Sequence, residues 1–280
     1  MKWFFLDLAG VNFENNRYHE EIIVFFNRVN GKCQDKRLFI LLSLFLVTVG
    51  MFLCRSFMRR CVIAGIQRVK GVATVSDRVK EYGPAVKARL AGDFERVGVT
   101  WPPRKMALIG LKDEKSLEAW ISQDGDTYHL LKSYPILNAS GKPGPKLKEG
   151  DCQVPEGLYR IESLNPNSRF HLSLRVNYPN DYDKRMAVHE ERTDLGGDIM
   201  IHGGHSSIGC LAMGDLAAEE LFVLAAETGV DNISVILSPV DFRTKEFEGD
   251  FSSMPSWIPD LYDQIKAVLM KYPKRTDGTN

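Results

Sequence analysis

The sequence has no surplus of charge of either sign. Its 280 residues include 36 Lys and Arg and 36 Asp and Glu, so the formal net charge is zero. Proteins that attract nucleic acids or acidic partners usually carry a basic excess. We therefore expect no nucleic-acid partner. Hydrophobic residues make up 44% of the chain, which is ordinary for a globular protein.

Cysteine is scarce as well. There are five cysteines in the chain, too few for a fold held together by disulfides. No CxxC pair and no repeated Cys/His spacing connects them, so the pattern does not favour a zinc finger. Internal repeats and low-complexity stretches are absent too. We expect no metal and no cofactor.

The sequence contains one long apolar run. Residues 38–54 (LFILLSLFLVTVGMFLC) carry no charge, and basic residues flank them on both sides. A bilayer core needs about 17–25 apolar residues, so this run is at the short end. We predict a single transmembrane helix or signal anchor over 38–54. The alternative is a buried core helix, but no amphipathic partner helices surround the run. The basic flanks give no orientation by the positive-inside rule.

The chain divides by composition into five parts. Residues 1–37 show no clear period and suggest no role, and residues 55–104 read as a basic linker followed by a helical region. Residues 105–243 form a predicted strand-rich domain, and 244–280 a helical C-terminal extension. The stretch before residue 38 is long for the start of a signal peptide. Segment 38–54 could therefore be a cleaved signal peptide only if translation starts after Met1.

Short strand patterns dominate from residue 105 onward. Apolar or alternating runs bounded by turn residues predict strands, and 3.6-residue periodicity predicts helices. Predicted strands lie at 106–111, 117–122, 127–134, 170–176, 198–202 and 233–237, and predicted helices at 76–92, 215–227 and 258–269. Many short strands with few helices indicate a mainly β fold.

The stretch 201–213 (IHGGHSSIGCLAM) suggests chemistry. A strand delivers His202 into a loop of small residues that ends at Cys210. A cysteine nucleophile needs a nearby base or cation to become a thiolate, and a flexible loop of this length can return Cys210 to His202. The backbone N–H groups of Gly209 and Cys210 are then placed to receive an oxyanion. We therefore predict a nucleophilic cysteine with a histidine base.

Two other interpretations fit the same residues. A cysteine between Ile208 and Leu211 is often a small buried hydrophobe. His202, His205 and Cys210 are also residue types that bind zinc, although no fourth ligand is evident. His205 lies closer to Cys210 in sequence, but His202 follows a strand that holds it more rigidly, so His205 is expected to touch substrate.

Seven short motifs, in order, resemble a known family. They are 144–146 (GPK), 150–151 (GD), 155–159 (PEGLY), 167–170 (NSRF), 177–183 (NYPNDYD), 201–203 (IHG) and 207–213 (SIGCLAM). Together they resemble the L,D-transpeptidase catalytic domain, or YkuD domain, most closely its murein transpeptidase-like and amidase-like branch in Gram-negative bacteria. The resemblance covers roughly residues 105–243 and does not reach residues 1–75.

The resemblance implies an L,D-transpeptidase-like β-sandwich with a few helices. It makes Cys210 the nucleophile, His202 the general base, and the carbonyl of Gly203 the group that orients the imidazole. In this family the thiolate attacks a meso-diaminopimelate carbonyl in a stem tetrapeptide, and the terminal D-alanine leaves. An amine then accepts the acyl group; with water as acceptor the enzyme is a peptidase or amidase.

Two positions depart from the commonest family pattern. Ile208 stands where a histidine is usual, and Ala212 stands where an arginine or asparagine is usual. The missing side chains help to hold stem peptides, so cross-linking is in doubt, whereas thioester chemistry is not. Arg169 and Asn177 are candidates to bind a stem-peptide carboxylate, and Ser207 is expected to contact substrate.

We thus expect a cysteine acyltransferase acting on peptidoglycan stem peptides. The alternatives are an amidase or peptidase that hydrolyses a diaminopimelate-linked amide, and a catalytically silent peptidoglycan-binding module. Expected partners are peptidoglycan stem peptides, a peptidoglycan-linked lipoprotein, and the inner membrane. The catalytic domain is expected in the periplasm, anchored by 38–54 or exported if that segment is cleaved.

Overall fold

The computed structural model describes residues 72–273. The predicted transmembrane segment 38–54 and residues 1–37 lie outside this range. Within the described range, no helix combines the length and apolar character needed to cross a membrane.

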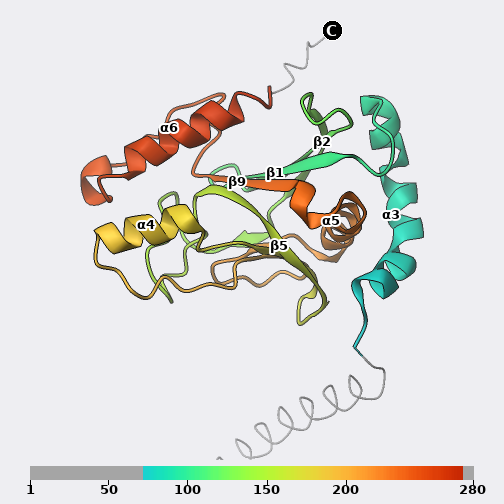
Figure 1. Ribbon diagram of the computed structural model, residues 1–280, viewed down its shortest axis with the longest axis horizontal. Coiled ribbons are helices and arrows are strands. Elements are labelled where there is room, and N and C mark those ends of the chain that lie inside the picture. The colour runs from blue at the N-terminus through green and yellow to red at the C-terminus, as the bar shows by residue number, and fades with distance from the viewer. Residues whose placement is uncertain (1–71, 274–280) are drawn as a thin grey trace, which may run out of the picture. The chain divides into compact units, whose positions relative to one another are not determined.

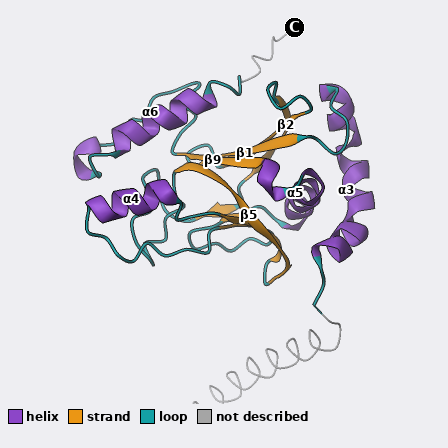
Figure 2. Cartoon of the chain, in the orientation of Figure 1, coloured by secondary structure: helices purple, strands orange, loops and turns teal. Residues whose placement is uncertain are grey.

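Nine strands form one continuous sheet in the order β3-β2-β1-β9-β5-β6-β7-β8-β4. The strands are β1 (Lys105–Leu111), β2 (Ser116–Ser122), β3 (His129–Pro135), β4 (Asn138–Ala139), β5 (Gly157–Ser168), β6 (His171–Val176), β7 (Met200–His202), β8 (Leu211–Ala212) and β9 (Ile233–Ser238). The helices of the described range are α3 (Val75–Val97), α4 (Asp181–His189), α5 (Asp215–Thr228) and α6 (Ile258–Leu269), with short 3₁₀ turns at Val230–Asn232 and Phe251–Ser253 (Figures 1 and 2).

The long strand β5 joins the two halves of the sheet. Its first residues, Gly157 to Arg160, pair with β9, and its later residues, from Ile161 to Ser168, pair with β6. The predicted mainly β domain is confirmed, with a continuous sheet in place of two separate ones. As a result, one chain segment connects the β1–β9 half to the half that contains His202.

Strand β1 is apolar along nearly its whole length because both of its faces are buried. Met106 and Leu108 face a core shared with α3 and α5, whereas Ala107 and Ile109 face a second cluster shared with α6. Figure 1 shows α6 and α5 on opposite sides of β1 and β9. A strand covered on both faces reads as a continuous apolar run, which is the pattern that predicted 106–111.

Helix α3 is longer than its sequence pattern indicated. Thr74 and Asp77 form a capping box at its start, and Gly98 closes its end in the left-handed conformation. The predicted end at Gly92 is wrong because Phe94, one turn after Leu90, also packs into the core. An isolated glycine in a helix is tolerated when tertiary packing continues past it.

Candidate active site

Strands β7, β8 and β4 bring the candidate catalytic residues to one face of the sheet. β7 and β8 run parallel, with Ile201 opposite Leu211 and His202 opposite Ala212. Ile201 and Leu211 are buried against the core. Since side chains alternate along a strand, His202 and Cys210 project to the other face. The structure therefore places the two predicted catalytic side chains on the same side of neighbouring strands.

The distance between them follows from strand geometry. Cys210 extends β8 by one residue and so lies opposite Met200, two residues from His202. A rise of about 3.3 Å per residue and a strand spacing of about 4.8 Å put the Cα atoms of Cys210 and His202 roughly 8 Å apart.

The imidazole of His202 is held in a defined orientation. The side chain is buried, its Nδ1 lies 2.6 Å from the carbonyl oxygen of Gly203, and its ring packs at 4.7 Å from that of Phe170. A carbonyl can only accept, so Nδ1 carries the proton and Nε2 is left as the basic nitrogen. Burial lowers the pKa of His202, which keeps the ring neutral and able to take a proton.

Only a glycine fits at position 203. A Cβ there would lie 2.7 Å from Asp215 Oδ1 and 2.8 Å from the carbonyl oxygen of Phe170. The next amide, that of Gly204, donates to Asp215 Oδ1 at 2.8 Å. The loop after β7 is therefore pressed against the start of α5, which fixes the Gly203 carbonyl that contacts His202.

The Cys210 sulfur lies between two backbone groups at the start of β7. It accepts a hydrogen bond from the amide of Met200 at 3.4 Å and contacts the carbonyl oxygen of Asp198 at 3.5 Å. Burial raises the pKa of Cys210; the Met200 amide and Lys146 oppose the rise, and the Asp198 carboxylate adds to it. Burial thus favours the neutral thiol of Cys210 in the absence of substrate.

Both backbone amides predicted to bind an oxyanion already have hydroxyl partners. The N–H of Gly209 donates to Ser140 Oγ, and the N–H of Cys210 donates to Ser207 Oγ at 2.9 Å. The Ser207 hydroxyl in turn donates to the Cys210 carbonyl oxygen at 2.6 Å. Ser207, predicted to touch substrate, thus closes the turn that carries the nucleophile, whereas Ser140 was not singled out from the sequence.

The other predicted binding residues do not gather at one point. Arg169 is exposed in the turn before β6, and Asn177 follows the end of β6, where its Oδ1 accepts from the amide of Arg160 at 2.8 Å. Six strand residues separate them, or roughly 20 Å. His205 is exposed in the loop, and its carbonyl accepts from Asn138 Nδ2 at 3.2 Å. Asn177 lines a polar cavity of about 540 Å³ beside α4.

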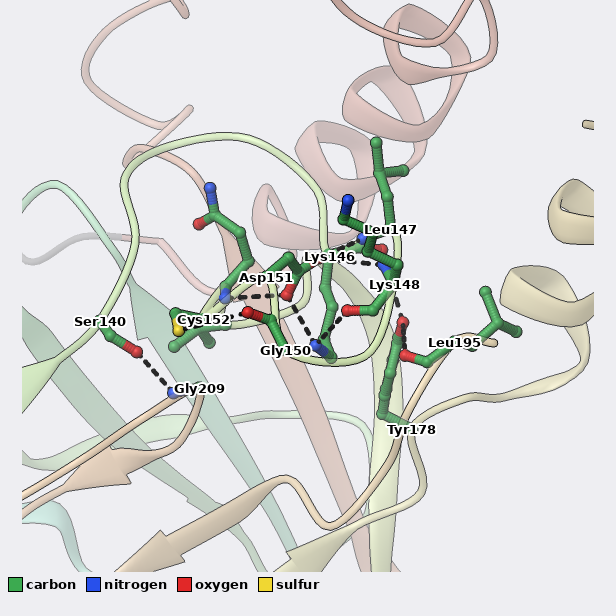
Figure 3. A network of polar contacts seen from close by, with 12 residues as sticks. Ser140, Lys146, Leu147, Lys148, Gly150, Asp151, Cys152, Tyr178, Leu195 and Gly209 are labelled. Atoms are coloured by element: carbon green, nitrogen blue, oxygen red, sulfur yellow. Dashed lines mark hydrogen bonds and ion pairs between the residues drawn. The ribbon is translucent and has the colours of Figure 1, made fainter. Parts of the chain in front are cut away.

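The segment between β4 and β5 is built around a buried lysine. Lys146 forms an ion pair with Asp151 Oδ1 at 2.7 Å and donates to the Lys148 carbonyl oxygen at 2.9 Å. The other carboxylate oxygen of Asp151 accepts from the amides of Leu147 and Lys148. Figure 3 shows this network beside the contact between Ser140 and Gly209. The motifs 144–146 and 150–151 therefore form an ordered loop next to the site.

A second buried ion pair fastens the same segment to the sheet. Lys112 and Glu156 lie 2.8 Å apart, and Lys112 Nζ also donates to the carbonyl oxygens of Gly144 and Val154. Glu156 accepts from the Gly144 amide and from the hydroxyl of Tyr262 on α6, each at 2.7 Å. These contacts give Glu156 a structural place under the loop.

The described residues offer no site for a metal ion. Across residues 72–273, no three His, Cys, Asp or Glu side chains lie close enough together to hold a metal ion.

Comparison with known proteins gives the domain a family. Residues 112–236 match the family model of the YkuD L,D-transpeptidase catalytic domain. A protein of Escherichia coli strain K12, provisionally named L,D-transpeptidase YafK, is 37% identical over 113 residues, which cover 40% of this chain and 43% of that protein. The chain thus matches less than half of this curated relative. The resemblance to the L,D-transpeptidase catalytic domain is confirmed over residues 112–236.

Among solved structures, similarity extends to the helical cell shape determining protein Pgp2 of Campylobacter jejuni. That likeness has a TM-score of 0.40 and 18% identity, and covers 60% of this chain and 70% of Pgp2. Bd1075 of Bdellovibrio bacteriovorus gives a TM-score of 0.37 and 18% identity over 60% of this chain and 55% of its own.

Proposed function

We propose that the protein is a cysteine acyltransferase that acts on peptidoglycan stem peptides through a thioester on Cys210. The observation that carries this proposal is the placement of Cys210 and His202 on one face of the sheet, with Nδ1 of His202 bound to the Gly203 carbonyl. The family of the domain supports the substrate class.

The neutral resting pair suggests the order of the first steps. The Cys210 thiol gives its proton to Nε2 of His202 as the sulfur attacks the substrate carbonyl, so that the thiolate exists only during attack. The carbonyl becomes a tetrahedral oxyanion, and its collapse expels the leaving amine. The imidazolium of His202 returns the proton to that amine, which leaves a thioester and a neutral His202.

The thioester then passes its acyl group to an acceptor. A second amine attacks the thioester carbonyl and gives its proton to His202, which returns it to the Cys210 sulfur as the thioester breaks. The new amide is the transfer product. If water attacks instead, the product is a free carboxylic acid, and the reaction is that of an amidase or peptidase.

The surroundings of Cys210 support a large share of hydrolysis. Ala212 is fully buried and cannot contact an acceptor, and Ile208 is 79% exposed but offers no hydrogen-bonding group. Water is present at about 55 M, so an acceptor amine must be positioned well to compete. We therefore propose hydrolysis of a diaminopimelate-linked amide, including one that holds a lipoprotein to peptidoglycan, as the second activity of the same thioester.

The test is mass analysis of the protein and its products. The purified chain is mixed with a disaccharide-tetrapeptide, and a mass increase on the Cys210 peptide with release of D-alanine is expected. Dimeric muropeptides in large excess over hydrolysed monomer would contradict the share assigned to water. Binding of the muropeptide without any adduct or product would instead indicate a silent peptidoglycan-binding module.

The proposed location is the periplasmic side of the inner membrane, where the substrate lies. This part of the proposal rests on the apolar run 38–54 and on the substrate class. A reporter that works only after export is expected to be active when it is fused after Asn280. Activity of a reporter that works only in the cytoplasm, fused at the same position, would contradict both the location and the substrate.

A further inference from the structure

Ser140 directly follows β4 and contacts the loop that carries the candidate nucleophile. β4 and β8 are antiparallel, with Asn138 opposite Ala212 and Ala139 opposite Leu211. Extended by one step, this register brings Ser140 near Cys210. By strand alternation the side chain of Ser140 shares the face of Cys210 and His202.

The hydroxyl of Ser140 accepts one hydrogen bond and retains a proton to donate. Its Oγ accepts from the amide of Gly209, the residue just before the nucleophile (Figure 3). Within residues 72–273, no acceptor for the Ser140 hydroxyl proton is found. Ser207 differs, because its hydroxyl both accepts from and donates to the backbone of Cys210. Of these two serines, Ser140 is therefore the one whose hydroxyl proton is free to donate a hydrogen bond to a substrate.

We propose that Ser140 is a catalytic residue whose hydroxyl donates a hydrogen bond to the oxyanion formed when Cys210 attacks a carbonyl. This inference rests on the proposed acyl transfer at Cys210. A side-chain hydroxyl can serve as an oxyanion donor when it is fixed before the charge develops. The amide of Gly209 fixes Ser140 Oγ in this way.

The hydrogen-bond chain strengthens the proposed donor. When a hydroxyl accepts a bond from an N–H group, its own proton becomes a better donor, because linked hydrogen bonds polarise one another. The Gly209 amide therefore acts on the oxyanion through Ser140. This arrangement explains why an amide predicted to face the substrate instead meets a serine hydroxyl.

Two simpler roles for Ser140 predict other results when the serine is replaced. If Ser140 only blocks the Gly209 amide and must move aside, removing the hydroxyl should speed acylation. If it only ties β4 to the loop, its removal should act like loss of the nearby contact from Asn138 to the His205 carbonyl. Asn138→Ala is thus a matched control on the same strand and the same loop.

The experiment compares two reactions of Cys210 in the full chain. Acylation by disaccharide-tetrapeptide passes through an oxyanion, whereas alkylation by iodoacetamide attacks a saturated carbon and forms none. Both rates are read by mass at the Cys210 peptide. We expect Ser140→Ala to slow acylation about 100-fold, the typical loss for one oxyanion donor, and to leave alkylation within about twofold of wild type.

A second pair of variants separates the hydroxyl from the shape of the side chain. Ser140→Thr keeps the hydroxyl and Ser140→Val replaces it with a methyl group of similar size, so Thr should acylate much faster than Val. Equal acylation by these two, or a rate for Ser140→Ala at or above wild type, would overturn the inference. Absence of acylation in wild type would overturn the proposed function, and with it the role of Ser140.

Discussion

His202 and Cys210 stand on neighbouring strands of one sheet face, but no hydrogen bond joins their side chains in the part of the chain that the structure describes. Each is instead held by backbone groups: His202 by the Gly203 carbonyl, and the Cys210 sulfur by the Met200 amide. Burial favours the neutral form of both side chains. The pair is therefore arranged for proton transfer during attack and not for a resting ion pair.

The alkylation of Cys210 should follow the pH dependence of a buried thiol. Because burial raises its pKa, the midpoint for reaction with iodoacetamide should lie above about 8.5, the value for an unperturbed cysteine. His202→Ala should not raise it further, since His202 makes no hydrogen bond to the sulfur. Peptide mass spectrometry distinguishes Cys210 from the exposed Cys152. A midpoint near neutral pH that rises in His202→Ala would instead reveal a thiolate–imidazolium pair.

Acylation should depend on His202 far more than alkylation does. A positioned general base typically contributes about 100-fold to 10,000-fold, so His202→Ala should slow acylation by at least about 100-fold. His189→Ala is the control, because His189 is exposed at the end of α4, and its rate should stay within a few-fold of wild type. Equal losses of acylation rate in the two variants would show that His202 is not the general base.

Gly203→Ala should destabilise the protein by about 1–3 kcal/mol, the usual cost of adding atoms to a packed site. The new methyl group would press on Asp215 Oδ1 and the carbonyl of Phe170. Gly92→Ala in α3 is the matched control: its Cβ meets no atom within 4 Å, and it should stabilise by about 0.5–1 kcal/mol through helix propensity. Denaturant unfolding measures both, and an unchanged Gly203→Ala would show that the loop can relax.

Removing the lysine of the buried pair should be costly because it strands a carboxylate. Lys112→Met leaves Glu156, whose side chain is fully buried, without its cation, and the expected loss is about 3–5 kcal/mol. Adding Glu156→Gln to Lys112→Met should recover much of that loss. Lys245→Met, which breaks the ion pairs of an exposed lysine with Asp113 and Glu114, should cost far less than Lys112→Met. A double variant no more stable than Lys112→Met would contradict this account of the pair.

The stability of the protein should carry a pH signature from Asp183. Burial raises its pKa from 3.8 to about 6, although the Asn180 amide and the Tyr159 hydroxyl oppose the rise. The folded state then binds a proton more tightly than the unfolded state does. This contribution to the free energy of unfolding is complete below pH 3.8 and is lost as the pH rises through about 6.

The measurement compares wild type with Asp183→Asn, which cannot ionise. Between about pH 4 and pH 8, wild type should lose up to about 3 kcal/mol relative to the variant, at 1.36 kcal/mol per pKa unit. Asp181→Asn is the control in the same helical turn, where the side chain is exposed. A difference between wild type and Asp183→Asn that does not change with pH would refute the raised pKa.

The longer elements could be predicted because each carries enough residues to show a period. Strand β1, strand β9 and helix α6 have buried positions that repeat or run continuously, and their predicted ranges lie within about one residue of the observed ones. Strands β4 and β8 have two residues each, too few for any alternation. Helix α4 was missed, although Asn180 and Asp183 form a capping box with a recognisable spacing.

The sequence alone could single out His202 and Cys210 as the candidate pair, but it could not predict their surroundings. His202 and Cys210 are close in sequence, and a short loop of small residues joins them. Ser140 contacts Gly209, which lies 69 positions away in the sequence. Phe170, in the turn between β5 and β6, packs against the ring of His202. Contacts between distant segments depend on strand register, which local patterns do not specify. The direction of the Cys210 pKa shift was equally out of reach, since it depends on how deeply Cys210 is buried.

The strand lengths on the two sides of β5 differ, and this has a consequence for heating. β1 and β2 have seven residues each, whereas β7, β8 and β4 have three, two and two. Short ladders open at a lower cost than long ones, and sub-global openings follow such units. Amide hydrogens around His202 and Cys210 should thus exchange with deuterium well before those of Ile109. Warming would open the candidate site reversibly at temperatures where most of the sheet is still intact.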